Sequence, residues 1–281
     1  MVSDRESALG RKTFEALREI AYSQAGIHLN DKKKALVSSR IAKRLRELQL
    51  SSPEDYLNFL KLDSSGEELV NFINAISTNY TYFFREDDHF EIMEKYFIKW
   101  LDEHQSRFRF WCAASATGEE PYSIILKLMK FLNQGNIDFK LLATDISTKA
   151  LDAAKAGVYP LDKLKTIPPE YRIQYTQKIN SEAGHFTFKN QVKNKIVFKR
   201  LNLSRPPFPM KGPLDLVFCR NVMIYFDNSV RQNLISNIES LLKPGGLLIT
   251  GHSETLRSID TEMIALTPSV YLKPYAGDHY E

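Results

Sequence analysis

The chain has 281 residues, of which 43% are hydrophobic, so it can bury a full core in one large domain or two small ones. It has no run of about 18 apolar residues and no apolar signal core at its N-terminus, so we expect a cytoplasmic protein that does not cross a membrane. Cys112 and Cys219 lie in apolar runs with no Cys or His at a metal-ligand spacing. We therefore expect two buried free thiols and no metal site.

The net charge of +4 is concentrated near the N-terminus. Residues 1–50 carry eleven Lys and Arg against six Asp and Glu, whereas residues 51–281 carry 27 against 28. A basic excess confined to one segment favours an acidic partner that meets that segment. It argues against a nucleic-acid groove that runs across the whole protein.

The first ninety residues are predicted to be helical. Apolar residues recur at helical spacing in two segments: Phe14, Leu17, Ile20 and Ala21 in the first, and Ile41, Leu45 and Leu48 in the second. Ser52-Pro53-Glu54-Asp55 is typical of a helix start, and further helices are expected at about 67–76 and 86–104. We therefore predict a small helical domain over residues 1–90, followed by a second domain over residues 91–281.

From Arg107 the pattern changes to short apolar strands that alternate with amphipathic helices. The expected strands are 107–114, 139–146, 195–201, 214–221, 245–251 and 270–275, and the clearest helices are 121–132, 147–156 and 228–243, the last closed by Pro244-Gly245-Gly246. This alternation predicts an α/β domain with a doubly wound, mostly parallel sheet. The segment at about 167–195 is polar and aromatic without a helical period, so we expect an insertion that forms a small antiparallel hairpin or sheet.

Candidate ligand-binding residues follow the expected strands, where open α/β sheets bind their ligands. After the first strand comes a run of small residues, 113–118, which is not G-x-G-x-x-G and so disfavours a dinucleotide. Asp145 ends the second strand, 25 residues beyond Glu120, at a position suited to ribose hydroxyls. Its alternative role is to cap the next helix, which Ser147 or Thr148 could do instead. Asn202, after the third strand, could hydrogen-bond an adenine edge.

Two further segments carry polar residues in apolar surroundings. Arg220 and Asn221 directly follow the fourth strand, where unpaired polar side chains make poor core residues, so a binding role is favoured. Residues 77–86 mix hydrogen-bonding side chains with aromatics before a helix. Taken alone, that segment is typical of an aromatic core plug with a helix cap. His252 follows a strand and could line the site, although structural hydrogen bonding is the favoured role.

Together, five segments resemble the signature of the CheR methyltransferases in order and spacing. They are TNYTYFFRE (78–86), AASATGEEPYSI (113–124), ATDIS (143–147), FCRNVMIYFD (218–227) and LKPGGLLITGHSE (242–254). The resemblance covers residues 13–274. It implies a class I methyltransferase-like fold that binds S-adenosylmethionine and releases S-adenosylhomocysteine, and an enzyme that esterifies glutamate side chains of bacterial chemotaxis receptors.

The resemblance also implies roles for individual residues. Cofactor contacts are expected from Asn79, Thr81, Arg85, Glu120, Asp145, Asn202, Leu203, Arg220 and Asn221. Arg85 and Tyr225 are expected to flank the site of methyl transfer. Glu120 is preferred to Glu119 because of its spacing to Asp145.

The implied partner is the cytoplasmic helical region of methyl-accepting chemotaxis proteins, so the enzyme would meet a membrane only through its receptor. Lys33, Arg40 and Arg44 recur at intervals of seven and four, and we expect them to form a basic stripe on one helix that docks on the receptor. The alternative is a solvated basic face.

The chemistry expected of this family needs no general base, because a glutamate carboxylate is already ionised at neutral pH. Two other functions compete with this reading. A nucleic-acid methyltransferase would share the sheet and cofactor, but residues 51–281 are near neutral and the fourth strand ends in CRN rather than Asp/Asn-Pro-Pro-aromatic. A cofactor-binding signalling module without catalysis is disfavoured because both Arg85 and Tyr225 are present.

Overall fold

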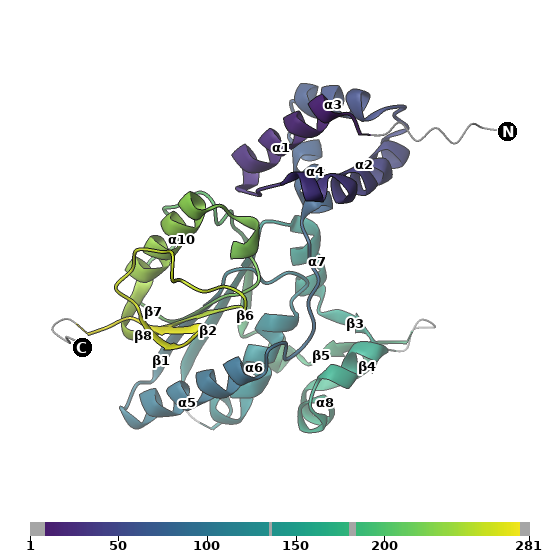
Figure 1. Ribbon diagram of the computed structural model, residues 1–281. Coiled ribbons are helices and arrows are strands. Elements are labelled where there is room, and N and C mark those ends of the chain that lie inside the picture. The colour runs from purple at the N-terminus through teal and green to yellow at the C-terminus, as the bar shows by residue number, and fades with distance from the viewer. Residues whose placement is uncertain (1–8, 135–136, 180–183, 276–281) are drawn as a thin grey trace.

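The computed structural model describes residues 9–134, 137–179 and 184–275. These residues form a helical N-terminal domain, an α/β domain and a small sheet on the flank of the α/β domain (Figure 1). Among the described residues, no helix is both long and apolar enough to cross a lipid bilayer. Cys112 and Cys219 are buried free thiols, as predicted.

The N-terminal domain consists of helices, as predicted. They are α1 (Arg11–Ala25), the 3-10 turn η1 (Asp31–Lys33), α2 (Lys34–Leu48), α3 (Pro53–Leu62) and α4 (Glu67–Ile76). The apolar stripes of these helices meet in one core, which includes Phe14, Leu17, Ile41, Tyr56 and Phe72. The predicted start of α3 is confirmed, because the Ser52 hydroxyl accepts a hydrogen bond from the N–H of Asp55 at 3.1 Å.

The α/β domain is built on the doubly wound sheet that the alternating pattern predicted. Its parallel strands are β1 (Arg107–Cys112), β2 (Asp138–Asp145), β6 (Ile196–Arg200), β7 (Leu214–Cys219) and β8 (Leu242–Thr250), and its antiparallel strands are β9 (Ile264–Thr267) and β10 (Val270–Leu272). The strand order is β6-β2-β1-β7-β8-β10-β9. The chain thus runs outward from β1 through β2 to β6 and then returns to the other side of β1. This reversal creates a crevice beyond the carboxyl ends of the central strands.

Helices cover both faces of this sheet (Figure 1). One face packs against α5 (Asp88–Asp102) and α6 (Glu119–Leu132), and the other packs against α10 (Asn228–Leu241). Side chains of strand β1 point to both faces of the sheet. Phe108 and Phe110 enter the core under α5 and α6, whereas Trp111 enters the core under α10. Helix α7 (Thr148–Ala156) lies beside α6, where the Tyr122 hydroxyl donates to the carbonyl of Ala154 at 3.0 Å.

The predicted insertion is a small antiparallel sheet, but it begins earlier and contains more helix than expected. We call it the small-sheet module: β3 (Val158–Pro160), η2 (Leu161–Thr166), α8 (Pro169–Tyr175), β4 (Thr176–Ile179), β5 (His185–Phe188) and α9 (Asn190–Lys193), with strand order β3-β5-β4. A three-residue strand and a seven-residue helix are too short to show a periodic pattern, which explains the missed start at Val158 and the missed helix α8.

The predicted end of the last long helix was also wrong. Helix α10 ends at Leu241, and strand β8 already begins at Leu242, which pairs with Leu214. Pro244, Gly245 and Gly246 therefore lie within β8, at the shift in its register with β7, rather than closing the helix. Gly245 takes a φ of 73°. Glycine adopts this conformation readily both in a turn after a helix and at an irregularity within a strand, so the sequence alone did not distinguish the two.

Candidate functional site

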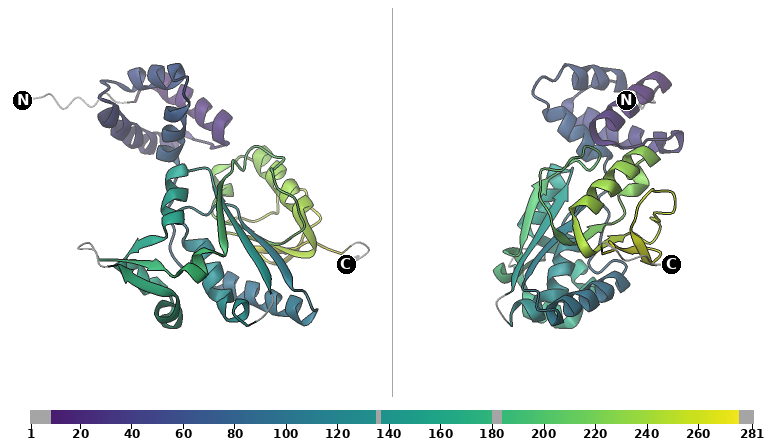
Figure 2. Two further views of the ribbon diagram at one scale, coloured as in Figure 1. Left: turned by 180° about the vertical axis from the view of Figure 1, so that it is seen from behind. Right: turned by 90° about the vertical axis from the view of Figure 1, so that its left-hand side faces the viewer.

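A pocket lies at the carboxyl ends of the parallel strands, where the helical domain covers the end of the sheet (Figure 2). It holds about 880 Å³ of space outside the protein atoms, part of it open to solvent. Its walls come from both domains: the end of α1, residues 76–81, the strand ends at 113–116 and 145–146, and residues 201–203 and 220–226. The N-terminal helices therefore form one wall of the crevice that the strand order creates.

The structure brings all ten predicted cofactor and catalytic residues to this one pocket. Its lining includes Asn79, Thr81, Arg85, Glu120, Asp145, Asn202, Leu203, Arg220, Asn221 and Tyr225. Seven of them lie at or after the ends of parallel strands, which end at one edge of the sheet, and Asn79, Thr81 and Arg85 come from the segment between α4 and α5.

Asp145 ends β2 and is 8% exposed. One of its carboxylate oxygens accepts from the N–H of Ala116, and the other accepts from the N–H of Ser147, both at 2.8 Å. Burial raises the pKa of Asp145, and these backbone hydrogen bonds oppose the increase. The Ser147 hydroxyl caps α7 through the N–H of Ala150, so the cap does not depend on the Asp145 side chain. Asp145 keeps further lone pairs for hydroxyl groups of a ligand.

Glu119 and Glu120 are neighbours on α6 but point to different surroundings. Glu119 is fully buried away from the pocket, where it pairs with Lys163 and accepts from the Thr117 hydroxyl at 2.6 Å. Glu120 lines the pocket and pairs with Arg220 at 2.7 Å. Burial raises the pKa of Glu120, and the charge of Arg220 opposes this. The preference for Glu120 therefore agrees with the placement of the two side chains.

Arg220 is 3% exposed and is held from several sides. One terminal nitrogen donates to Glu120, and the other donates to a Glu86 carboxylate oxygen at 3.0 Å. The guanidinium carbon lies 5.6 Å and 5.8 Å from the ring centroids of Phe90 and Phe218, a cation–π arrangement. Buried charges are stable only when paired in this way, so Arg220 is fixed before any ligand binds.

Two acids behind the pocket were not predicted, Glu86 and Glu254. Glu86 accepts from Arg220 and, at 3.4 Å, from the Asn221 side-chain amide. Burial opposes its ionisation, but the charge and hydrogen bond of Arg220 outweigh burial and lower the pKa of Glu86. Glu254 accepts from the backbone N–H groups of Asn221 and Gly251 at 2.6 and 2.8 Å, and it holds Asn221 at a φ of 57°. Both acids lie in segments that resemble the CheR signature, and this resemblance is the sequence feature that could have identified them.

Two histidines adjoin this network. His89 is fully buried, its Nε2 lies 2.8 Å from the Ser269 hydroxyl, and burial followed by the charge of Arg220 lowers the pKa of His89 to about 4. Glu86, His89 and His252 could offer ligand atoms within 4.8 Å of one another. However, Arg220 already pairs with Glu86 and would repel a metal cation, so we assign these residues a hydrogen-bonding role and no metal.

Asn202 lies where the two domains join. Its side-chain amide donates to the carbonyl of Gln24 in α1 at 2.8 Å, and its oxygen accepts from the N–H and hydroxyl of Ser204. One amide N–H is left for an adenine edge. Nearby, the N–H of His28 donates to the carbonyl of Tyr225 at 2.8 Å. Asn202 and Tyr225 therefore also help to hold the helical domain over the pocket.

Several predicted groups remain available to a ligand. Within the described part of the chain, the side chains of Asn79 and Thr81 and the Tyr225 hydroxyl make no hydrogen bond. The Arg85 side chain is 28% exposed, donates to the carbonyl of Tyr80 at 3.3 Å and lies 3.8 Å from Glu86, which leaves further N–H groups uncommitted. Polar groups without partners in a pocket are suited to binding.

The three cations predicted to form one stripe have different surroundings. Lys33 belongs to η1, just before α2 begins, and its Nζ lies 4.7 Å above the ring centroid of Tyr225. Arg40 is exposed on α2. The Arg44 side chain is only 15% exposed because it pairs with the buried Glu68. The prediction of a single stripe on one helix was therefore wrong, since Lys33 precedes the helix and Arg44 stabilises the helical core.

The pocket fits an adenosine ligand that carries a charged amino-acid chain. Asp145 is placed for ribose hydroxyls, Ile146 and Leu203 supply apolar walls for a base, and Glu120 faces the pocket as an acid. Gly118 has a φ of 100°, and a Cβ there would come within 2.8 Å of the Tyr159 hydroxyl, so the turn before α6 requires glycine. This fold and this site define an S-adenosylmethionine-dependent methyltransferase.

The chain belongs to the CheR methyltransferase family. The family model for the CheR methyltransferase SAM-binding domain matches residues 79–271, and the model for the CheR all-alpha domain matches residues 12–77. A chemotaxis protein methyltransferase of Borreliella burgdorferi is 38% identical over 92% of each chain. That of Salmonella typhimurium is 36% identical over 94% of this chain and 91% of its own, and chemotaxis protein methyltransferase 2 of Pseudomonas aeruginosa is 39% identical over 87% and 86%. S-adenosylmethionine is therefore the cofactor, and methylation in chemotaxis is the process.

The placement of the two neighbouring glutamates gives a matched pair of variants. We expect Glu120→Gln to weaken S-adenosylhomocysteine binding about tenfold, because the pocket loses its acid, whereas Glu119→Gln should leave the affinity within about twofold. Glu119→Gln should instead lower the melting temperature, since it leaves Lys163 without a buried partner. Titration calorimetry and thermal unfolding measure the two effects, and the reverse pattern would assign the cofactor contact to Glu119.

Proposed function

We propose that this chain transfers a methyl group from S-adenosylmethionine to glutamate carboxylates in the cytoplasmic helical region of chemotaxis receptors, forming glutamyl methyl esters. The observation that carries this proposal is that Arg85 and Tyr225 both line the cofactor pocket and that both have uncommitted donors. The names of the relatives, which are chemotaxis protein methyltransferases, agree with it.

The reaction needs orientation more than acid–base chemistry. S-adenosylmethionine supplies an electrophilic methyl group on a sulfonium. A glutamate carboxylate is already ionised at neutral pH, so it can attack without a base. The Arg85 guanidinium offers a planar pair of N–H donors that matches a carboxylate, and the Tyr225 hydroxyl offers another donor. Holding the carboxylate in line for displacement can supply several kcal/mol.

We further propose that Lys33 and Arg40 attract the acidic receptor region. Lys33 lies beside the pocket over Tyr225, and Arg40 is exposed on the next helix without an ion pair among the described residues. Arg44 is not included, because Glu68 already neutralises it. Exposed charges act over about 10 Å at 0.1 M salt, so this attraction should depend on ionic strength.

We expect the double variant Lys33→Glu, Arg40→Glu to raise the KM for receptor several-fold at low salt and to leave S-adenosylhomocysteine affinity unchanged. Arg44→Glu is the contrasting variant: it places a third acid against Glu68 and Glu47, so its main effect should be a lower melting temperature. Receptor methylation kinetics at 0.05 and 0.5 M salt test the first expectation. A wild-type KM for the double variant at low salt would show that these cations belong to a solvated face.

The proposed function itself is tested with methyl-labelled S-adenosylmethionine and bacterial receptor membranes. We expect label on the receptor that is released as methanol by mild base, because esters hydrolyse and N-methyl groups do not. Receptors whose methylation-region glutamates are replaced by alanine are the control and should take up no label. Base-stable label, or label on nucleic acid instead of receptor, would refute the proposal.

A further inference from the structure

Two exposed tyrosines stand at the mouth of the pocket. Along residues 79–82 exposure alternates: Asn79 and Thr81 are partly covered in the pocket, whereas Tyr80 and Tyr82 are 76% and 39% exposed. The two rings lie 6.3 Å apart in an edge-on arrangement. Neither hydroxyl makes a hydrogen bond within the described residues. Tyr80 also borders the pocket, whereas Tyr82 does not. The same short segment thus turns polar groups into the pocket and presents two aromatic rings at its rim.

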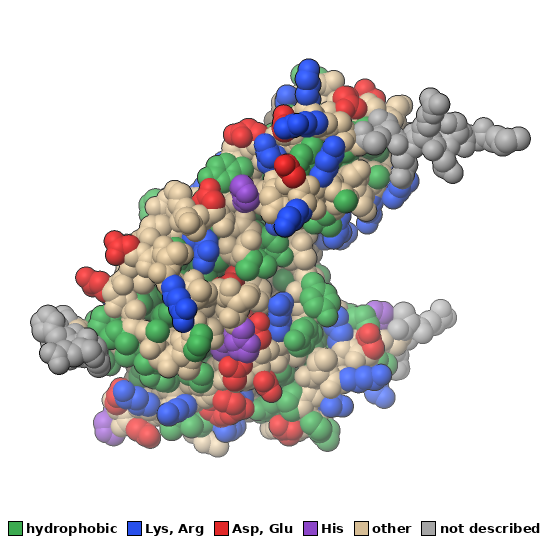
Figure 3. All heavy atoms as spheres, viewed as in Figure 1, with side chains coloured by type: hydrophobic (Ala, Val, Ile, Leu, Met, Phe, Trp, Pro, Cys, Tyr) green, Lys and Arg blue, Asp and Glu red, His purple; other side chains and the backbone are tan. Residues whose placement is uncertain are grey.

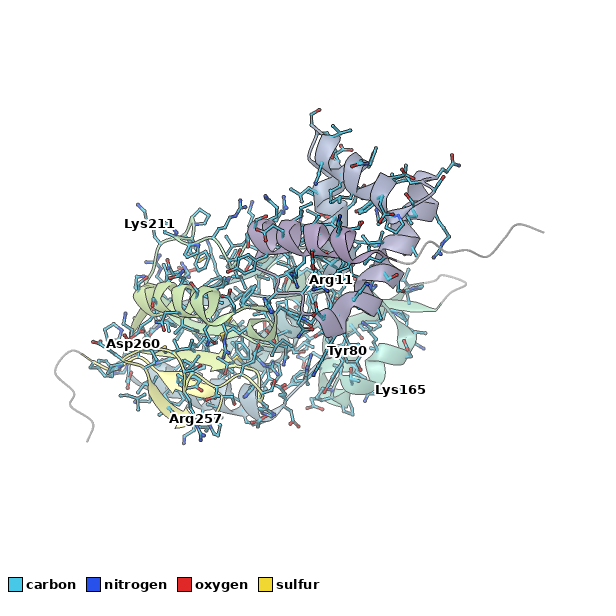
Figure 4. The ribbon with its side chains drawn as sticks, turned by 45° about the horizontal axis from the view of Figure 1, so that its top comes forward. Arg11, Tyr80, Lys165, Lys211, Arg257 and Asp260 are labelled. Carbon is cyan, nitrogen blue, oxygen red and sulfur yellow. The ribbon has the colours of Figure 1, made fainter. Side chains whose placement is uncertain are left out.

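This aromatic pair is attached to the proposed catalytic arginine. The guanidinium carbon of Arg85 lies 6.0 Å from the ring centroid of Tyr82, and its terminal nitrogen donates to the carbonyl of Tyr80. A carboxylate bound by Arg85 would therefore lie close to these rings. Figure 4, in which Tyr80 is labelled, places it between the N-terminal helices and the small-sheet module.

The surroundings indicate what kind of partner fits. The space-filling view shows a notch in the outline between the helical domain and the small-sheet module, with Lys and Arg side chains on its upper border (Figure 3). Arg85 supplies positive charge next to the ring of Tyr82, and Lys33 supplies a second cation over the ring of Tyr225, which lines the same pocket. A complementary partner carries carboxylates beside an apolar surface, as an acidic amphipathic helix does. Tyrosine is well suited to such a contact, because it buries a large area at a low cost in side-chain entropy.

We propose that Tyr80 and Tyr82 form a platform against which the receptor helix packs beside the target glutamate. This inference rests on the proposed function. The rings bury the apolar residues that flank the glutamate, and Arg85 then receives its carboxylate. The platform acts on receptor recognition and leaves cofactor binding to the inward-facing side chains of the same segment.

The test uses Tyr80→Ala, Tyr82→Ala and the double variant of the full chain. Because both rings are exposed, we expect folding to be unchanged and the KM for receptor to rise at least fivefold in each single variant and more in the double variant. S-adenosylhomocysteine affinity should stay within about twofold. Tyr82→Phe should retain a KM close to wild type, since the ring remains. Leu266→Ala on β9 is the matched control, because Leu266 is 40% exposed but lies on a distant strand.

The outcomes separate this inference from the proposed function. If the wild-type enzyme forms no base-labile ester on receptor membranes, both proposals are wrong. If the wild type methylates receptor and the alanine variants keep its KM, only the platform is wrong. If Tyr80→Ala weakens S-adenosylhomocysteine binding as much as it raises KM, Tyr80 belongs to the cofactor site, which also overturns the platform.

Discussion

Asp145→Ala is expected to weaken S-adenosylhomocysteine binding by about 1–3 kcal/mol, or roughly 5- to 150-fold, without unfolding the protein. A pair of ribose hydroxyls would lose its acceptor. The N–H of Ala116 would also lose its acceptor, so the turn between β1 and α6 would be held less firmly. Both effects act on the cofactor, whereas α7 keeps its Ser147 cap. Titration calorimetry measures the affinity, and thermal unfolding checks the fold.

The same carboxylate predicts a dependence on pH. Burial holds the pKa of Asp145 above its ordinary value of 3.8, so acidification should protonate it, and weaken binding, at a higher pH than for an exposed aspartate. In Asp145→Asn the loss of S-adenosylhomocysteine affinity at low pH should be smaller, because the asparagine side chain does not titrate. Asp152→Ala is a matched control, since this carboxylate is 76% exposed on the neighbouring helix α7. Unchanged affinity in Asp145→Ala would remove Asp145 from the site.

Prediction from the sequence succeeded where a periodic pattern was long enough. The helix over residues 67–76 and the strand that ends at Asp145 agree with the structure, because each buries one regular face over many residues. The small-sheet module was placed too late, since β3 has only three residues and its pairing with β5 is set by tertiary contacts. The predicted end of the helix at Pro244 was also wrong. The helix ends earlier, because Leu242 already pairs with Leu214 in the sheet.

The sequence predicted which residues meet in the pocket, but not the side chains behind them that hold these residues in place. Parallel strands end at one edge, so residues after successive strands had to meet, and the family resemblance named the rest. Glu254 was missed because its contacts are with backbone N–H groups, which no side-chain pattern reveals. The prediction that Arg44 belongs to an exposed stripe was wrong for a related reason. Its partner Glu68 lies 24 residues away on another helix, and the spacing of residues along α2 cannot predict that contact.

Arg85→Ala is expected to lower the turnover of receptor methylation about 100-fold or more, with less than about a threefold change in S-adenosylhomocysteine affinity. The variant removes the guanidinium proposed to align the attacking carboxylate, and losses of alignment appear mainly in the rate. It leaves the main-chain carbonyl of Arg85 in place, which accepts a hydrogen bond from Arg220, so the clamp on Glu120 survives. Turnover is measured at saturating receptor and cofactor.

Graded variants separate charge from geometry at this position. Arg85→Lys should recover part of the lost rate, because it restores the charge without the planar pair of donors. Tyr225→Phe should lower turnover by roughly tenfold, since it loses one donor but keeps the ring beneath Lys33 and the carbonyl that binds His28. Arg257→Ala is the matched control, because Arg257 is exposed and lies well away from Tyr80 (Figure 4). Wild-type turnover in Arg85→Ala would exclude the guanidinium from methyl transfer, and an equal loss of cofactor affinity and turnover would make it a binding residue instead.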